Sequence, residues 1–281
     1  MVLKLKKLQK AVKEPVEMVA RTITRDPRIE MLARFGYVAN GVLHGLLGFA
    51  AITIAFGSHQ EADQSGVLGP LTQSVLGRVL VIAIFAGLLS LAVWKISEVI
   101  VMRRAKQAKR RFFRLEELSK AVVYLVLALT SVAFLFNHAS TSASITTSQH
   151  VTLDLLRMPL GIPLLYILSI VLIVIGVNFM YRGITRRFLD SLEDDAPVAL
   201  DLPVKVLGVV GYITKGVIFI VLGGVFFNAA YTFDPGKASG LDGAFRSFIA
   251  LPFGAVLLAL VGVGFLMYAA YSIARARLAE M

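Results

Sequence analysis

The chain has 281 residues, 57% of them hydrophobic, and a formal net charge of +11. Soluble domains are about 45–50% apolar, so this composition, with a mean hydropathy of +0.76, excludes an ordinary soluble globular protein. The absence of cysteine excludes disulfides, thiolate metal sites and cysteine nucleophiles.

The first 30 residues are expected to form a basic cytoplasmic leader, separate from a membrane domain over residues 31–281. Apolar residues recur at helical spacing from Leu5 to Val19, and lysines lie on the opposite side of that helix. These lysines are Lys6, Lys7, Lys10 and Lys13. Such a helix can lie in the membrane interface against anionic lipid. A disordered arm held by its charge is the alternative.

Six apolar stretches follow, each long enough for a helix to cross a bilayer, which takes about 20 residues. Transmembrane strands would be about half as long and would alternate in polarity. The stretches lie at 36–57, 77–101, 118–138, 160–182, 207–231 and 250–273. The expected fold class is therefore an all-α integral membrane protein with six transmembrane helices.

These helices form three copies of one unit. The glycine and tyrosine pattern of the first copy recurs 175 residues later, and a fainter copy lies 80 residues after the first. The matched residues are Gly36 with Gly211, Tyr37 with Tyr212, Gly41 with Gly216, and Gly48 with Gly223. The repeats cover approximately 31–103, 112–187 and 203–275. Three tandem parallel helical hairpins predict a pseudo-threefold bundle, with glycines where helices approach closely.

Lysine and arginine alternate in density between the connections. Nine of the 29 lie in residues 1–35 and seven between Arg103 and Arg114, whereas the outer connections carry few. This bias follows the positive-inside rule, so both termini are expected in the cytoplasm and no nucleic-acid partner is needed to explain the charge. The first inner connection fits an anionic-lipid contact and a plain topology signal equally well. Its cations include Arg103, Arg104, Arg110 and Arg111.

The inner ends of the helices carry polar and aromatic residues. Lys95 and Glu98 are three residues apart and can pair on one helix face, while Trp94 suits an interfacial belt. Four polar residues near the inner ends are interpreted as forming helix–helix hydrogen bonds or interfacial anchors rather than substrate contacts. They are Asn178, Tyr181, Tyr268 and Tyr271.

The repeats place Asn40, Lys120 and Lys215 at equivalent positions, and each is followed by 16 residues without a formal charge. At 1.5 Å per residue that stretch spans about 24 Å, so the three side chains are expected at one level, just inside the cytoplasmic face of the hydrocarbon. One turn deeper, His44 and Tyr124 are again equivalent. These residues are the candidate site for an anionic group such as a lipid phosphate or a carboxylate. The alternative is that each lysine extends separately to the interface along apolar surface.

No catalytic constellation is found in the sequence. It lacks H-E-x-x-H, G-x-S-x-G and phosphate-loop motifs, and the predicted helix centres contain no acidic residue. The four histidines show no metal-ligand spacing, and His44 fits packing better than proton transfer because the other repeats place aromatic residues there. No enzyme activity, cofactor or metal site is therefore predicted.

The segment from Arg34 to Gly41, with its copy in the third unit, resembles a bacterial membrane family known as domain of unknown function 1206. Members of that family look like three tandem two-helix repeats with an A-R-x-G-Y-x-A-R-G signature. The likeness covers about residues 31–275 and is weak in the second unit, where Glu116 and Glu117 replace the Gly-Tyr pair. Asn40 also stands where the family has a basic residue. The resemblance implies a multi-pass protein of the bacterial cytoplasmic (inner) membrane and supplies no catalytic residues.

The leading hypothesis is a non-catalytic accessory or scaffold protein that binds anionic lipid or partner membrane subunits on its cytoplasmic side. Short outer connections, a basic inner surface and an expected neutral bundle interior favour it. The alternative is a small-solute or anion transporter or channel, with a path along the pseudo-threefold axis and Lys215 as an anion contact. A water-filled cavity lined by Asn40, Lys120 and Lys215 would favour transport, and a packed axis would favour the scaffold.

Overall fold

The computed structural model describes residues 27–57, 71–101, 107–136, 152, 157–158, 160–191, 198–238 and 240–278, and these ranges contain helices and turns but no strand. The long helices are α2 (Pro27–Ala55), α4 (Val75–Val101), α5 (Gln107–Phe136), α7 (Gly161–Ile184), α8 (Val198–Thr232) and α10 (Gly254–Leu278). The short elements are helix α9 (Gly240–Ile249) and the 3-10 turns η1 (Arg187–Ser191) and η2 (Pro235–Lys237).

The length of the helices decides how many spans are supported. Five of them, α2, α4, α7, α8 and α10, are long and apolar enough to cross a membrane, which confirms an all-helical, multi-pass membrane protein. Helix α5 lies where the third span was predicted, but its described apolar stretch, Lys120–Val132, is shorter than a span. The third of the six predicted spans, and with it the count of six, therefore stays a prediction.

Local chemistry at the helix ends joins the first and last described helices. Pro27 begins α2, where its fixed φ and missing N–H suit a first helical turn. Glu30 in that turn complements the positive end of the helix dipole and accepts a hydrogen bond of 3.0 Å from Arg34 Nε. The Arg34 guanidinium also donates to the carbonyl oxygens of Ala276 and Arg277, at 3.0 and 2.9 Å. Arg34 thereby ties α2 to the last turn of α10.

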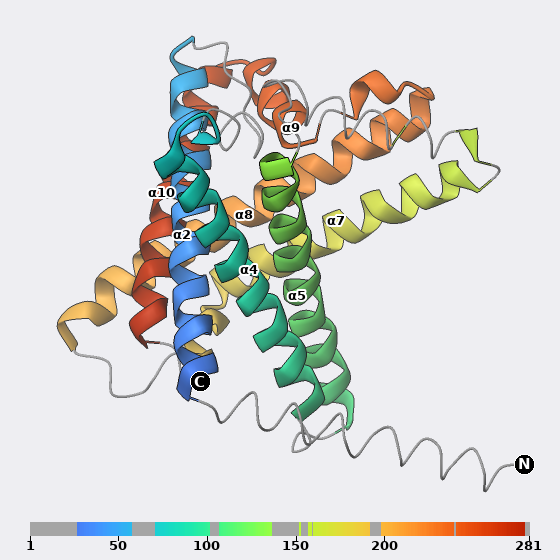
Figure 1. Ribbon diagram of the computed structural model, residues 1–281. Coiled ribbons are helices and arrows are strands. Elements are labelled where there is room, and N and C mark those ends of the chain that lie inside the picture. Colours follow the sequence, from blue (N-terminus) through green and yellow to red (C-terminus); the bar gives the residue numbers. More distant parts are fainter. Residues whose placement is uncertain are drawn as a thin grey trace, which may run out of the picture.

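Successive long helices run in opposite directions (Figure 1). Helices α2, α5 and α8 begin towards the lower end of that view, and α4, α7 and α10 return towards it. Three hairpins of one orientation require this arrangement. The end at which α2 begins and α10 ends is called the basic end below.

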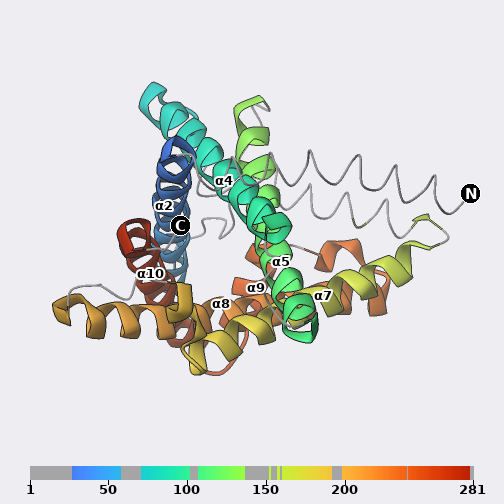
Figure 2. The ribbon, with the colours of Figure 1, turned by 90° about the horizontal axis from the view of Figure 1, so that it is seen from below.

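The second helix of each repeat packs most extensively against the first helix of the next repeat. The pairs are α4 with α5, α7 with α8, and α10 with α2, which closes the series. Figure 2 shows α10 beside α2 and α7 running along α8. Contacts within a repeat are smaller, and among the described residues α5 and α7 form none of comparable extent. Helices α7 and α8 also lie at a steep angle to α2 (Figure 1), so a regular pseudo-threefold bundle is not confirmed.

Small residues at one repeated register allow these helix pairs to approach. A Cβ on Gly48 of α2 would lie 2.7 Å from the carbonyl oxygen of Gly262 on α10. A Cβ on Gly223 of α8 would lie 2.8 Å from the carbonyl oxygen of Ser169 on α7. The equivalent position of α5 holds Ala128, which is fully buried. Gly48 and Gly223 therefore set contacts between repeats, whereas a Cβ on the matched pair Gly36 and Gly211 would meet the second helix of its own repeat, at Gly87 and Tyr268.

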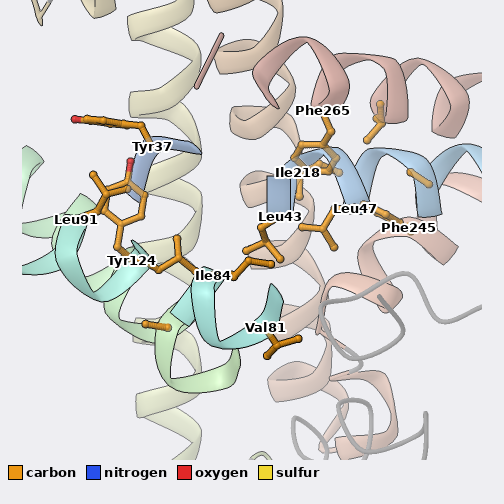
Figure 3. Close-up of a cluster of buried hydrophobic side chains, with 14 of the residues drawn as sticks. Tyr37, Leu43, Leu47, Val81, Ile84, Leu91, Tyr124, Ile218, Phe245 and Phe265 are labelled. Carbon is orange, nitrogen blue, oxygen red and sulfur yellow. The ribbon is translucent and has the colours of Figure 1, made fainter. Parts of the chain in front are cut away.

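The larger hydrophobic core joins α2, α4, α5, α8, α9 and α10. Tyr37 and Tyr124 lie at one end of it, and Phe245 and Phe265 at the other (Figure 3). Leu43 is fully buried between these ends. Helix α9, which the sequence analysis did not predict, places the Phe245 ring 6.2 Å from that of Phe265. Apolar side chains thus fill the region where these helices meet.

Candidate functional site

The bundle interior is charged, so the expected neutral interior is wrong. Five cationic side chains, one from each of α4, α5, α7, α8 and α10, are at most 7% exposed: Lys95, Lys120, Arg182, Lys215 and Arg275. Among the described residues, Glu117 and Asp242 are the acidic side chains buried to the same degree. Arg182 and Arg275 lie near the inner ends of their helices, where the positive-inside rule alone would account for them, because a sequence gives depth along a helix but not the side that faces the protein.

An ion-pair cluster joins α4 to α5. Glu117 pairs with Lys120 one turn along α5 and, at 3.2 Å, with Lys95 of α4. Lys95 also binds Glu98 at 2.5 Å, which confirms that predicted pair. Trp94 is 2% exposed and donates from Nε1 to Glu98 at 3.1 Å, so it is buried in the protein rather than placed in an interfacial belt. Lys120 therefore belongs to a compensated buried cluster.

Tyrosines occupy the Glu117 position in the other two repeats. Tyr37 and Tyr212 are the equivalent residues, and each lies beside a buried arginine of a neighbouring helix. Arg275 Cζ lies 4.7 Å from the Tyr37 ring centroid, and Arg275 donates to the Tyr212 hydroxyl at 3.3 Å. Arg182 Cζ lies 6.0 Å from the Tyr212 ring centroid. The second repeat thus replaces an arginine–tyrosine contact by a carboxylate cluster.

Lys215 of α8 is surrounded by aromatic rings. Its Nζ lies 4.2 Å from the ring centroid of Tyr268 and 4.9 Å from that of Phe179, and the residue is 3% exposed. In the described part of the chain no acidic side chain pairs with it. Cation–π contacts stabilise a desolvated ammonium by about 2 kcal/mol or more. The charge of Lys215 is therefore met by ring faces and not by a carboxylate.

Asn40 and His44 face the same region from α2. Asn40 Nδ2 donates to Ser272 Oγ at 2.9 Å, while Asn40 Oδ1 is buried and accepts no hydrogen bond. His44 Nδ1 lies 2.8 Å from the Asn40 carbonyl oxygen. A carbonyl only accepts, so Nδ1 carries the proton of the neutral ring and Nε2 is left as an acceptor. The His44 ring lies 4.7 Å from that of Tyr268 and within electrostatic range of Lys215.

The structure thus brings together three of the five predicted residues, namely Asn40, His44 and Lys215, around Tyr268. Lys120 lies apart from them and pairs with Glu117 in the ion-pair cluster between α4 and α5. Tyr124 of α5 is 6% exposed, and Figure 3 shows its hydroxyl directed towards Tyr37. Both lysines are buried in the protein instead of extending along its surface.

The sequence analysis missed the second-helix residues that complete this region. Ser272 and Phe179 lie 93 residues apart, as do Arg275 and Arg182. Aligning α10 with α7 by that shift puts Ser272 and Phe179 at one register, where they contact Asn40 and Lys215 respectively. Aligning the second helices with one another in the sequence could therefore have pointed to these residues.

The family comparison divides the chain at the same repeats. The model of the Domain of Unknown Function (DUF1206) matches residues 35–101, 118–186 and 210–279. The chain belongs to the DUF1206 family. An uncharacterized protein YxxB from Bacillus subtilis (strain 168) is 26% identical over 250 residues, which cover 88% of this chain and 90% of that protein. No solved structure matches the chain.

The basic end of this DUF1206 protein carries exposed cations. Arg186, Arg187 and Arg277 are exposed there, and Arg187 Cζ lies 5.1 Å from the ring centroid of Tyr181, itself 43% exposed. The predicted membrane-surface cations lie outside the residues whose side chains are described: Lys6, Lys7, Lys10, Lys13, Arg103, Arg104, Arg110 and Arg111. Within the described ranges no group of histidine and acidic side chains is suited to a metal ion.

Proposed function

We propose that this DUF1206 protein is a non-catalytic accessory or scaffold protein of the bacterial cytoplasmic membrane, with both termini in the cytoplasm. It binds anionic lipid or a partner membrane subunit at its basic end. The observation that carries this proposal is the set of exposed arginines at that end, of which Arg187 lies against the Tyr181 ring. The filled apolar core between the helices also supports a scaffold.

Electrostatics explains why the basic end would select anionic lipid. The negative cytoplasmic leaflet attracts each nearby arginine or lysine by about 1 kcal/mol. A planar guanidinium such as that of Arg187 matches phosphate geometry, and tyrosine is enriched at the membrane–water interface. The basic leader and the connection from Arg103 to Arg114 would add to the same surface.

Neutralising Arg186 and Arg187 together as Arg186→Gln and Arg187→Gln is expected to weaken phosphatidylglycerol binding about 30-fold, which corresponds to about 1 kcal/mol for each arginine. The measurement is lipid enrichment around the full chain in nanodiscs of phosphatidylglycerol and phosphatidylethanolamine. A matched control at the other end, Arg78→Gln with Lys237→Gln, is expected to leave enrichment unchanged. Equal loss in both variants would contradict a basic-end site.

A second experiment tests partner binding and the basic segments outside the described residues. Removing residues 1–30 and neutralising the connection from Arg103 to Arg114 is expected to reduce retention of lipid and of any co-purifying subunit. Unchanged retention of both would end the proposal.

A small-solute or anion transporter is the second candidate, and the buried Lys215 without an acidic partner among the described residues favours it. On this hypothesis, Lys215→Met abolishes anion flux into proteoliposomes that contain the purified protein. A variant with normal flux, or a wild-type protein with none, would rule it out.

A further inference from the structure

The Lys215 cluster, defined as Asn40, His44, Lys215 and Tyr268, lies between α2, α8 and α10. Lys215 places its side-chain nitrogen where the residue is 3% exposed and in contact with two aromatic rings. Ring faces offset only part of the hydration that a buried ammonium loses. A negatively charged group next to Nζ would complete the compensation.

One buried acceptor atom of the cluster lacks a donor, and a second atom is also able to accept. Asn40 Oδ1 belongs to a fully buried residue and has no hydrogen-bond partner. His44 Nε2 is an acceptor because Nδ1 donates to the Asn40 carbonyl oxygen. A buried acceptor without a donor is unfavourable, so the complementary ligand carries a hydroxyl as well as a negative charge.

We propose that the Lys215 cluster binds a small oxyanion that carries a hydroxyl group, with hydrogen phosphate as the simplest example. Lys215 Nζ binds the charged oxygens, and the hydroxyl of the anion donates to Asn40 Oδ1. His44 Nε2 accepts from the same anion or from its bound water. This site lies inside the bundle; it goes beyond the proposed binding of lipid at the basic end and names the class of anion for the Lys215 contact of the second candidate, but it requires binding only and no transport.

The repeats explain why one of the three equivalent positions is suited to an anion. In the second repeat, Lys120 already has the carboxylate of Glu117. In the first, Asn40 is neutral and binds Ser272. In the third, Lys215 contacts the ring of Phe179 of α7. Phe179 is the residue of α7 that is equivalent to Ser272 of α10. The third repeat therefore supplies a cation, and the first supplies the acceptor beside it.

Phosphate and sulfate distinguish the two parts of the proposal. Both carry negative charge, but sulfate has no hydroxyl at neutral pH and leaves Asn40 Oδ1 without a donor. Sulfate is therefore expected to bind about 10-fold more weakly or worse. The experiment is isothermal titration of the purified full chain with sodium phosphate and with sodium sulfate at matched ionic strength.

Two variants test the residues. Lys215→Met is expected to abolish phosphate binding, whereas Lys205→Met, the same change nearer the start of α8, is expected to leave it within about 2-fold of wild type. Asn40→Asp places a negative charge in the cluster and removes the Nδ2 donor to Ser272, so it is expected to abolish phosphate binding, and thermal unfolding measured alongside shows whether the variant is folded. Asn40→Asp is isosteric, so it tests the site even where Lys215→Met fails to fold.

Binding of phosphate by wild type and Lys205→Met, with loss in the other two variants and weak sulfate binding, supports the site. No phosphate binding by wild type, unchanged binding by Lys215→Met, or equal binding of sulfate overturns it. The phosphate monoester of phosphatidic acid has the same charged oxygens and ionisable hydroxyl as hydrogen phosphate, so a titration in nanodiscs with this lipid decides the source. Competition there assigns the site to the lipid headgroup, and its absence assigns it to the free anion.

Discussion

Replacing Glu117 by glutamine is expected to lower the free energy of unfolding by about 3–5 kcal/mol, because it removes the carboxylate that Lys95 and Lys120 share in the protein interior. The measurement is reversible unfolding of the purified protein by sodium dodecyl sulfate in mixed micelles. The loss is expected to be large because the Glu117 side chain is 4% exposed and those of the lysines 5% and 8%.

Glu98→Gln is the matched control for this variant. Glu98 binds the same Lys95, but its side chain is 26% exposed. Exposed or half-exposed ion pairs contribute about 0–1 kcal/mol, so the control is expected to lose no more than that. Equal destabilisation by the two variants would show that the α4–α5 cluster does not depend on buried charge.

Alanine substitutions at two adjacent glycines of α8, Gly223 and Gly224, are expected to change the stability of the protein in opposite directions. Gly223→Ala is expected to destabilise the protein by about 1–3 kcal/mol, because its Cβ would lie 2.6 Å from Ile173 and 2.8 Å from the Ser169 carbonyl oxygen of α7. The same contact includes a hydrogen bond of 2.7 Å from Ser169 Oγ to the Gly223 carbonyl oxygen. Any separation of α7 from α8 would lengthen that bond.

Gly224→Ala is expected to have the opposite sign. A Cβ at Gly224 would meet nothing within 4 Å, and alanine is favoured over glycine in a helix by about 1 kcal/mol. The two variants differ by one position and by no chemistry, and the same unfolding measurement compares them. Similar values for both would mean that α8 does not pack on α7 in this register.

The equivalence of Gly48 and Gly223 could be read from the sequence, and the structure places both at close contacts. Their partners could not be read, because a glycine indicates that something approaches closely without saying which helix it is. Gly48 faces α10 and Gly223 faces α7, each a second helix of another repeat in cyclic order, whereas Gly36 and Gly211 face the second helix of their own repeat.

The candidate site was predicted only in part, because the sequence gives the position of a residue along a helix but not the helix that it faces. The repeats gave the shared register of Asn40 and Lys215, which depends only on position along the chain. The 16-residue stretches without formal charge lie on the first helix of each repeat. They therefore give no information on the cations that the second helices bring into the interior. Arg275 counts toward the positive-inside bias and is also buried against Tyr37, and the rotation of α10 decides this second role.

Glu117 shows how a departure from the repeat carries information. Its replacement of tyrosine was visible in the sequence as a weak match of the second unit. The physical consequence, a carboxylate between lysines of two helices, required the position of Lys95 on α4.

Native mass spectrometry of the protein released in a patch of its own membrane tests the proposed function most directly. The account predicts a chain that retains anionic lipid, or one partner subunit at fixed stoichiometry, and that loses it when Arg186 and Arg187 are replaced by glutamine. A chain that emerges with neutral lipid alone and no partner would contradict the account.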